Sequence, residues 1–527
     1  MTGIGNASLR ITTKSPEAQA YFNQGLRLLY AFWYFESYRA FRECATLDPS
    51  AAMAYWGMAQ ALANFPTMQE AENAAVEKAE ATMGSVSAHE RQYIQAAADL
   101  AQSQGADGRA SYILQMQSII REYPGDLNAP ALLALFMMSG YGADGQAMPG
   151  QLYAEELLRG ILAVQPDDVA ANHLWIHAVE GGPSPKDGLK SAEIVARLAP
   201  ASGHLVHMLG HVYFRLGDYE KAREAFLHSM SVDEAYLASE HIPPQDDSNY
   251  EHNLSYLAAD CSEEGRYHEA LKWAQKLDGL RASPVYWASA LNYSIPVGST
   301  LLRVHLRYGD WLAAARDSTD FGVDAAQLGI AAREYEQGWH LYARGMAELE
   351  SDRDVTATSR ADQNSLALDT LLDDLQKRQQ REPSIAAFWT GGALRLLGIA
   401  ADELQGSLEC AKRQYVAGLK DLESAEERQQ ELGYTEPPYY ACPVEETIGN
   451  VYLAMHAWNL AREAFRQELR LRPRSGFALF GIAESYEMEG RDHQATQEYE
   501  SFLAAWPHAD PGLPQVSKAK AWLAAHP

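Results

Sequence analysis

The sequence has few cysteines, few basic residues and no long apolar run. Its 527 residues include 4 cysteines, Cys44, Cys261, Cys410 and Cys442, which are far apart and form no Cys-x-x-Cys pair. Neither a disulfide framework nor a cysteine-based zinc site is therefore indicated. No stretch of 18 uncharged apolar residues occurs, and the first residues lack the basic and apolar segments of a secretion signal. We expect a cytoplasmic protein that does not bind membranes.

Positive charge is also scarce. Lys and Arg number 43 against 70 Asp and Glu, which gives a formal net charge of −27. A surface of this sign repels nucleic acid, so we expect no nucleic-acid partner. The same acidity is an ordinary means of keeping a large helical protein soluble, and it leaves basic ligands open.

Several enzyme signatures are missing. The chain has no Gly-x-Ser-x-Gly, no Walker A loop, no His-Glu-x-x-His and no EF-hand ligand string, and Gly3-Ile-Gly5 is too short for a dinucleotide fingerprint. We therefore expect no nucleotide cofactor and no serine-triad hydrolase.

What is present is a repeat. One set of large, small and aromatic positions recurs after 34 residues, the length of the tetratricopeptide helix-turn-helix repeat. Small residues let the helices of a repeat approach, aromatics fill the gap to the next repeat, and a proline ends the second helix. The first C-terminal copy consists of Ile448, Gly449, Tyr452, Ala461, Phe465 and Pro473, and the second includes Ala483, Tyr486, Gly490, Ala495, Tyr499 and Pro507. The pattern predicts an all-α fold, a right-handed α-solenoid that is open or curled closed around a central groove.

The periodicity predicts further helices and two loops. Helices are expected at 68–82, 87–103, 109–122, 126–139, 150–164, 188–198, 267–277, 284–307, 311–317, 323–350, 362–381, 384–405 and 407–432. Polar insertions at 239–250 and 351–364 are predicted to be loops, the first of which is either a lid over a site or a plain connection.

One continuous solenoid over 1–527 is the expected domain organisation. Its segments are N-terminal repeats at 14–66, irregular helical repeats at 67–166, a His-rich core at 167–280, irregular helical repeats at 281–432, and C-terminal repeats with a cap at 433–527.

Two His-x-x-x-His spacings stand one repeat apart. His173 with His177 and His207 with His211 are offset by 34 residues, so equivalent positions should face each other on adjacent first helices. Imidazole is a common ligand of zinc, copper and iron, and helix axes about 8–10 Å apart allow rings from two helices to reach one ion. The expected metal ligands are His173, His177, His204, His207, His211 and His252. Imidazoles without thiolate favour copper or iron, with zinc also open, and one ion or two remain open; packed helical histidines are the alternative.

Three further residues are candidates for catalysis. Glu180 could complete a two-His-one-carboxylate face or hold a ring N–H, and Tyr250 is a candidate proton or radical participant. Glu436, in Glu436-Pro437-Pro438, either faces the metal or belongs to a rigid entry into the next helix. The run Phe32-Trp33-Tyr34-Phe35 is read as packing between repeats, with a ligand-stacking role as the alternative.

The chain resembles a widespread family of bacterial-type tetratricopeptide-repeat proteins along nearly its whole length. The residues that carry the resemblance are 48–57, the His173–Ala178 block, the Gly203-His204-x-x-His207-Met208 block with His211, the Glu436-Pro437-Pro438 segment and 505–510. The resemblance implies a continuous α-solenoid and a histidine block that is a family feature, but no particular reaction. Relatives tend to show Pro-Ser at Leu209-Gly210 and Arg at Glu445, so a substrate contact at Glu445 is in doubt.

Three functions follow from these observations. The first is a metal-dependent oxidoreductase that acts on a small organic molecule with dioxygen or water. The second is a scaffold without catalytic activity, whose concave groove receives a peptide or partner helix. The third is a metal store or sensor.

Overall fold

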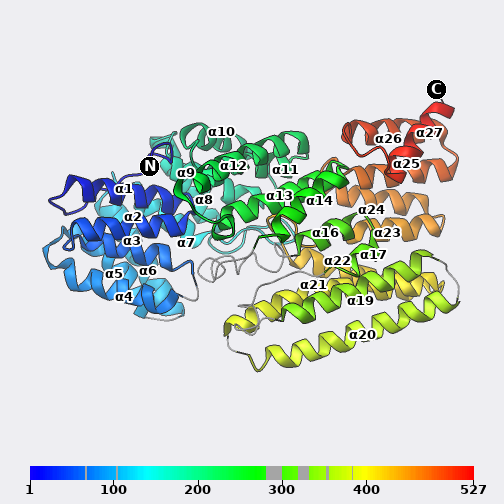
Figure 1. The fold of residues 1–527 in the computed structure, drawn as a ribbon, viewed down its shortest axis with the longest axis horizontal. Helices are drawn as coiled ribbons and strands as arrows, with labels where there is room; N and C mark the ends of the chain where they lie inside the picture. The colour runs from blue at the N-terminus through cyan, green and yellow to red at the C-terminus, as the bar shows by residue number, and fades with distance from the viewer. Residues whose placement is uncertain are drawn as a thin grey trace. The chain divides into compact units, whose positions relative to one another are not determined.

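The computed structural model describes residues 1–65, 68–102, 105–280, 299–317, 331–351, 355–382 and 384–526, which are mainly helical (Figure 1). These ranges contain no β-strand, and a single bridge joins Tyr141 to Ala147. The expected all-α fold is confirmed.

The chain forms two compact units. Unit 1 comprises Met1–Val212 and Ala225–Pro243, and unit 2 comprises Tyr213–Glu224 and Pro244–Pro527. The continuity of a single solenoid with the expected segments stays a prediction.

Unit 1 is a succession of paired helices. Consecutive helices pack against each other from α1 to α10, and α1 also contacts α9. The helices are α1 Pro16–Tyr30, α2 Tyr34–Leu47, α3 Ala52–Leu62, α4 Gln69–Thr82, α5 Ala88–Gln102, α6 Ala106–Glu122, α7 Asn128–Met137, α8 Gln151–Val164, α9 Val169–Glu180 and α10 Leu189–Leu198, with parts of α11 Gly203–Arg215 and α12 Tyr219–Glu240.

Unit 2 contains the remaining parts of α11 and α12 and the rest of the chain. Longer helices form its centre, where α19, α20 and α21 pack on one another. Its helices are α13 Ser248–Glu263, α14 Tyr267–Asp278, α16 Thr300–Arg307, α17 Trp311–Ala314, α19 Ala332–Ser351, α20 Val355–Gln379, α21 Ser384–Ala411, α22 Tyr415–Glu431, α23 Val444–Ala454, α24 Trp458–Leu471, α25 Gly476–Glu489, α26 Asp492–Ala505 and α27 Pro514–Ala525.

The helix starts that matter for the site have side-chain caps. The Ser15 side chain accepts a hydrogen bond from Ala18 N at the start of α1, and the Asp168 side chain accepts one from Ala171 N at the start of α9. Such caps satisfy backbone donors that have no partner within the helix and fix the residue at which it begins.

A recurring pair of a phenylalanine and a glycine sets the helix spacing. A Cβ on Gly210 would lie 2.3 Å from the Phe226 ring, one on Gly25 would lie 2.7 Å from Phe41, and one on Gly449 would lie 2.6 Å from Phe465. In each case the phenylalanine follows its glycine by 16 residues. The close approach therefore needs glycine, and it gives a physical reason for the small and aromatic positions in the sequence pattern.

The structure corrects one predicted loop and shortens another. The expected loop at 351–364 is wrong for its described residues, because α19 extends to Ser351 and α20 begins at Val355 and continues beyond residue 364. The expected loop at 239–250 is reduced, since α12 extends to Glu240, a 3-10 helix covers Pro244–Asp246 and α13 begins at Ser248. The helices expected at 284–307 and 323–350 begin outside the described residues, and α16 and α19 are their described parts.

Candidate metal centre

Two helices of unit 1 carry a buried cluster of imidazoles. α9 carries His173, His177 and Glu180, and α11 carries His204, His207 and His211. All six are at most 7% exposed except His177, whose side chain is 13% exposed. We call these six residues the imidazole cluster.

Three rings of the cluster meet at their Nε2 atoms. His173 Nε2 lies 3.1 Å from His204 Nε2 and 3.1 Å from His177 Nε2. One ligand atom from each of the three residues lies within 4.8 Å of the other two. This is a candidate three-nitrogen metal site, built from two helices of the same unit.

The His207 and His211 rings form a second pair. Their Nε2 atoms are 2.6 Å apart, and the ring of Phe226 packs on His207 with a centroid distance of 4.7 Å. The i, i+4 spacing on α11 places both rings on one face of the helix.

Glu180 connects the two groups of rings. Its Oε1 accepts a hydrogen bond from His177 Nδ1 at 2.6 Å, and its Oε2 lies 2.9 Å from His211 Nδ1. Burial alone would raise the pKa of Glu180, but the imidazoles of His177 and His211 hold it well below its usual value. A carboxylate that accepts from Nδ1–H fixes the tautomer of each ring and leaves Nε2 available to a metal.

His173 is oriented by the backbone of α1. Its Nδ1 lies 2.6 Å from the carbonyl oxygen of Tyr30, and because a carbonyl only accepts, Nδ1 is assigned as the donor. Burial lowers the pKa of His173 well below its usual value, so the ring is neutral and its Nε2 carries a lone pair. That single lone pair faces two other Nε2 atoms, and it can accept a linear hydrogen bond from only one of them.

The arrangement fits a transition metal ion. Two nitrogen ligands bound at 2.0–2.1 Å with angles between octahedral and tetrahedral lie about 2.8–3.4 Å apart. Both Nε2 separations at His173, 3.1 Å each, fall in this interval. A metal ion can accept the Nε2 lone pairs of all three rings at once, whereas one proton can bridge only two Nε2 atoms.

Phe32 packs over the imidazole cluster, a contact that the sequence did not predict. Its ring is stacked on His177 with centroids 5.3 Å apart and meets the edge of His173 at 4.6 Å. Its φ of 53° lies in the left-handed region, where a bulky residue costs about 1–2 kcal/mol. The strained turn between α1 and α2 therefore directs this aromatic ring at the imidazoles. By contrast, Trp33 of the same run meets the ring of Tyr236 on α12, with centroids 4.4 Å apart.

A cavity of about 630 Å³ in unit 1 begins at the same turn. Tyr30 and Tyr34, which flank the Phe32 turn, line it together with residues of α3 to α7. Its volume is within the range of small-molecule sites.

The other three predicted site residues belong to unit 2. His252 and Tyr250 are on α13 and are 5% and 2% exposed, and Glu436 lies between α22 and α23. A role of these three residues in a metal site stays a prediction.

The structure also changes the expected ring partners. The sequence placed His173 opposite His207 as the equivalent position of the next repeat, whereas the structure brings His173 to His204. The reason is that α9 and α11, the first helices of neighbouring repeats, do not face each other in strict register, so a residue one turn earlier on α11 reaches the Nε2 of His173. The equivalent positions His177 and His211 do lie near each other, with ring centroids 6.2 Å apart.

Models of the tetratricopeptide repeat match the chain at residues 204–236 and 477–509. The chain thus contains tetratricopeptide repeats, and the first matched repeat includes His204, His207 and His211. No curated protein matches the sequence.

Solved helical-repeat structures resemble the chain distantly. A human IFIT1 dimer with m7Gppp-AAAA is 12% identical, covers 86% of this chain and 90% of its own, and has a TM-score of 0.38. Yeast Tom70 is 13% identical, covers 97% and 96%, and has a TM-score of 0.32.

Among the described helices, none is both long and apolar enough to cross a membrane. A cytoplasmic location stays a prediction.

Proposed function

We propose that this tetratricopeptide-repeat protein binds a transition metal ion through His173, His177 and His204. The observation that supports the proposal is the His173 Nε2 atom, which faces two further Nε2 atoms at 3.1 Å. Copper and iron suit an imidazole site without thiolate, and zinc suits it as well.

The reaction that we favour is oxidation of a small organic molecule by dioxygen. When bound, copper or iron would supply the electron-transfer chemistry. The chain would hold the ligand rings in one tautomer through Glu180 and the Tyr30 carbonyl, exclude water from the cluster with Phe32, and receive a substrate in the cavity beside Tyr30 and Tyr34.

Elemental analysis tests the metal proposal first. The full chain is expressed in metal-replete medium or reconstituted anaerobically with Cu, Fe or Zn, and bound metal is measured per chain. We expect stoichiometric metal that is lost in His173→Ala and retained in His493→Ala, an exposed histidine on α26. Wild-type protein that retains no metal, with His173→Ala unchanged, would contradict the proposal.

Oxygen uptake separates an enzyme from a store. Metal-loaded protein is assayed with candidate substrates, and turnover is expected to vanish in His173→Ala. Tight stoichiometric binding with no oxygen consumption would instead indicate a metal store or sensor.

A scaffold function is the second candidate, and the two matched tetratricopeptide repeats favour it. Repeats of this kind present extended concave surfaces that receive peptides or partner helices. A stoichiometric protein partner that binds the metal-free chain at neutral pH, and binds His173→Ala equally well, would support this candidate over the metalloenzyme.

A further inference from the structure

Unit 2 contains a large cavity that is independent of the imidazole cluster. Its volume is about 820 Å³, and residues of α16, α17, α19, α21, α23 and α25 contribute to its wall. Cavities of 300–1,000 Å³ are the size that binds small molecules in proteins.

A buried carboxylate lies in the wall. Glu403 is 1% exposed and accepts hydrogen bonds from Tyr342 Oη at 2.9 Å, from Tyr440 Oη at 2.5 Å and from Thr447 Oγ1. A carboxylate has about four acceptor positions, so three hydroxyl donors leave one for a ligand. No ion pair with Glu403 occurs among the described residues. Burial raises the pKa of Glu403, an effect that a nearby positive charge would oppose.

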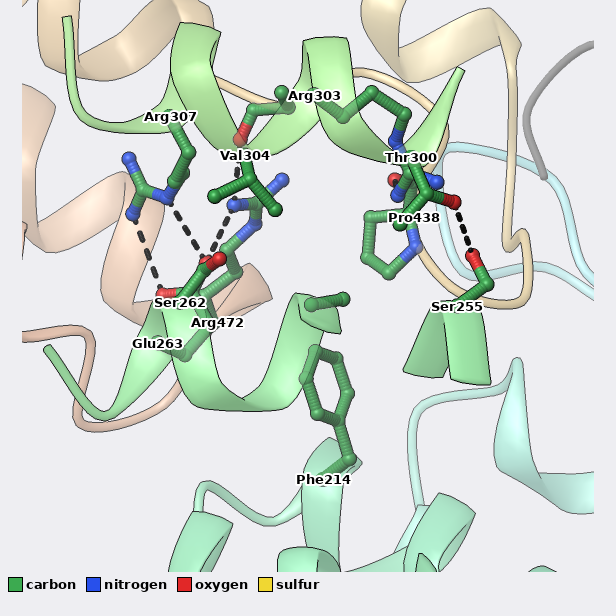
Figure 2. Close-up of a pocket in the computed structure, with 12 residues that line it drawn as sticks. Phe214, Ser255, Ser262, Glu263, Thr300, Arg303, Val304, Arg307, Pro438 and Arg472 are labelled. Atoms are coloured by element: carbon green, nitrogen blue, oxygen red, sulfur yellow. Dashed lines mark hydrogen bonds and ion pairs between the residues drawn. The ribbon is translucent and has the colours of Figure 1, made fainter. Parts of the chain in front are cut away.

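The buried cation of the wall is already engaged elsewhere. Arg307 Nε lies 3.0 Å from Glu263 Oε1, and Arg307 Nη1 lies 2.7 Å from Glu446 Oε1. Figure 2 shows Arg307 and Arg472 both directed at the carboxylate of Glu263. The carboxylates of Glu263 and Glu446 therefore neutralise the charge of Arg307, and Glu403 has no ion pair with it.

The remaining charge of the wall is mostly negative. Glu350 and Glu484 also line the cavity, whereas Arg413, its other basic residue, is exposed to solvent. An anionic ligand would meet a carboxylate excess, while a cationic ligand would be attracted.

Aromatic rings form much of the rest of the wall. Trp311, Tyr342, Phe477 and Phe480 line the cavity and can contact an apolar body or the face of a cation. Burial raises the pKa of Glu350, and a side-chain hydrogen bond with Trp311, a residue that is 9% exposed, opposes this effect.

We propose that the unit 2 cavity binds a small organic ammonium ion with an aromatic body, whose N–H donates to Glu403. The proposal rests on the wall of unit 2 alone and does not depend on metal binding in unit 1.

Calorimetric titration of the full chain in chelator-containing buffer tests it with three matched probes. Tyramine carries the ammonium, tyrosol replaces it with a neutral hydroxyl, and 4-hydroxyphenylacetate replaces it with a carboxylate. We expect tyramine to bind at least tenfold more tightly than tyrosol, and the acid not to bind. Equal affinities for tyramine and tyrosol, or no tyramine binding at millimolar concentration, would overturn the proposal.

Variants separate the charge from the cavity. Glu403→Gln should weaken tyramine binding at least tenfold and leave tyrosol unchanged, whereas Ser407→Phe, which fills the cavity, should weaken both. Glu463→Gln removes an exposed carboxylate on α24 and should change neither. Unchanged tyramine binding in both cavity variants, each with a wild-type melting curve, would contradict the assignment. If Glu403→Gln fails to fold, the ratio of the tyramine and tyrosol affinities of the wild-type chain decides.

Discussion

At the residue scale, the orientation of each imidazole depends on the partner of its Nδ1 atom. Glu180 holds His177 and His211 at once, and the Tyr30 carbonyl holds His173. All three contacts leave Nε2 turned toward another ring. The cluster is therefore organised by residues that need not touch a metal themselves.

Replacing Glu180 with glutamine tests this role. The amide oxygen of Glu180→Gln can accept from one ring, but its NH₂ group would oppose the Nδ1–H of the other ring. We expect metal affinity to fall about 10–100-fold, the usual effect of losing a carboxylate behind a ligand histidine. Competition with a chromophoric chelator measures the affinity, and Glu193→Gln, an exposed carboxylate on α10, is the matched control. Equal affinities in the wild type and Glu180→Gln would show that the carboxylate has no such role.

Asp260 of unit 2 is also a buried carboxyl, but its pKa is shifted in the opposite direction from that of Glu180. Neither of its oxygens has a hydrogen-bond partner in the described part of the chain. Burial, with a contribution from Glu264, raises the pKa of Asp260 well above its usual value. Because the pKa of Asp260 is higher in the folded state than in the unfolded state, its contribution to the free energy of unfolding is fully present below the unfolded pKa. That contribution is lost as the pH rises through the folded pKa.

We therefore expect Asp260→Asn to raise the free energy of unfolding at pH 8. Each pKa unit of the shift corresponds to about 1.4 kcal/mol at high pH, and the advantage should shrink as the pH falls toward about 4. Urea unfolding at pH 5, 6.5 and 8 measures it. Asp374→Asn, in an exposed pair with Lys377, should change stability by less than about 1 kcal/mol at every pH. A lower stability of Asp260→Asn at pH 8 would contradict the burial argument.

At the scale of elements, the site depends on how closely α11 approaches α12. Gly210 of α11 lies against the ring of Phe226 on α12, and that ring also packs on His207. The same phenylalanine thus sets the helix spacing and supports an imidazole of the cluster. Repeat packing and site geometry are coupled through it.

Gly210→Ala should consequently destabilise the protein although alanine favours helix. The added Cβ would lie 2.3 Å from the Phe226 ring, so the ring or the helix must move. We expect this overpacking to lower the free energy of unfolding by about 1–3 kcal/mol. Gly160 on α8 has no atom within 4 Å of an added Cβ, and Gly160→Ala should stabilise by up to about 1 kcal/mol. Denaturant midpoints of the two variants should move in opposite directions, and an equal rise in both would refute the close approach.

The helices were more predictable from the sequence than the partners of the site residues. The pattern at 188–198 predicted α10 at Leu189–Leu198, and that at 267–277 predicted α14 at Tyr267–Asp278, because caps and apolar spacing are local. The polar stretch at 351–364 misled, since polar residues also form the exposed face of a long helix such as α20.

The imidazoles of α9 and α11 could be selected because their spacing is encoded in two neighbouring repeats. Phe32 could not be selected from the sequence. It lies far from the histidines along the chain, in an aromatic run for which packing between repeats is a sufficient explanation. Its contact with His177 results from the approach of α1 to α9, which no local pattern records.

At the scale of the whole molecule, the two units carry different chemistry. Unit 1 holds the imidazole cluster and unit 2 the cavity with Glu403. A ligand that binds only folded protein stabilises by about 2.7 kcal/mol at a concentration of 100 times its Kd. Because stability varies locally within a protein, this gain should be concentrated around the bound residues.

Hydrogen exchange with and without Zn²⁺, a redox-silent probe, should therefore show a regional response. We expect slower exchange in α9, α11 and the turn at Tyr30–Phe32, because His173 hydrogen-bonds to the Tyr30 carbonyl and Phe32 packs on the rings. Exchange in α19 to α22 of unit 2 should not change. His173→Ala should abolish the protection, while His493→Ala should keep it. Protection that appears only in unit 2, or that survives His173→Ala, would place the metal elsewhere and leave the three-nitrogen contact at His173 to be explained by a proton.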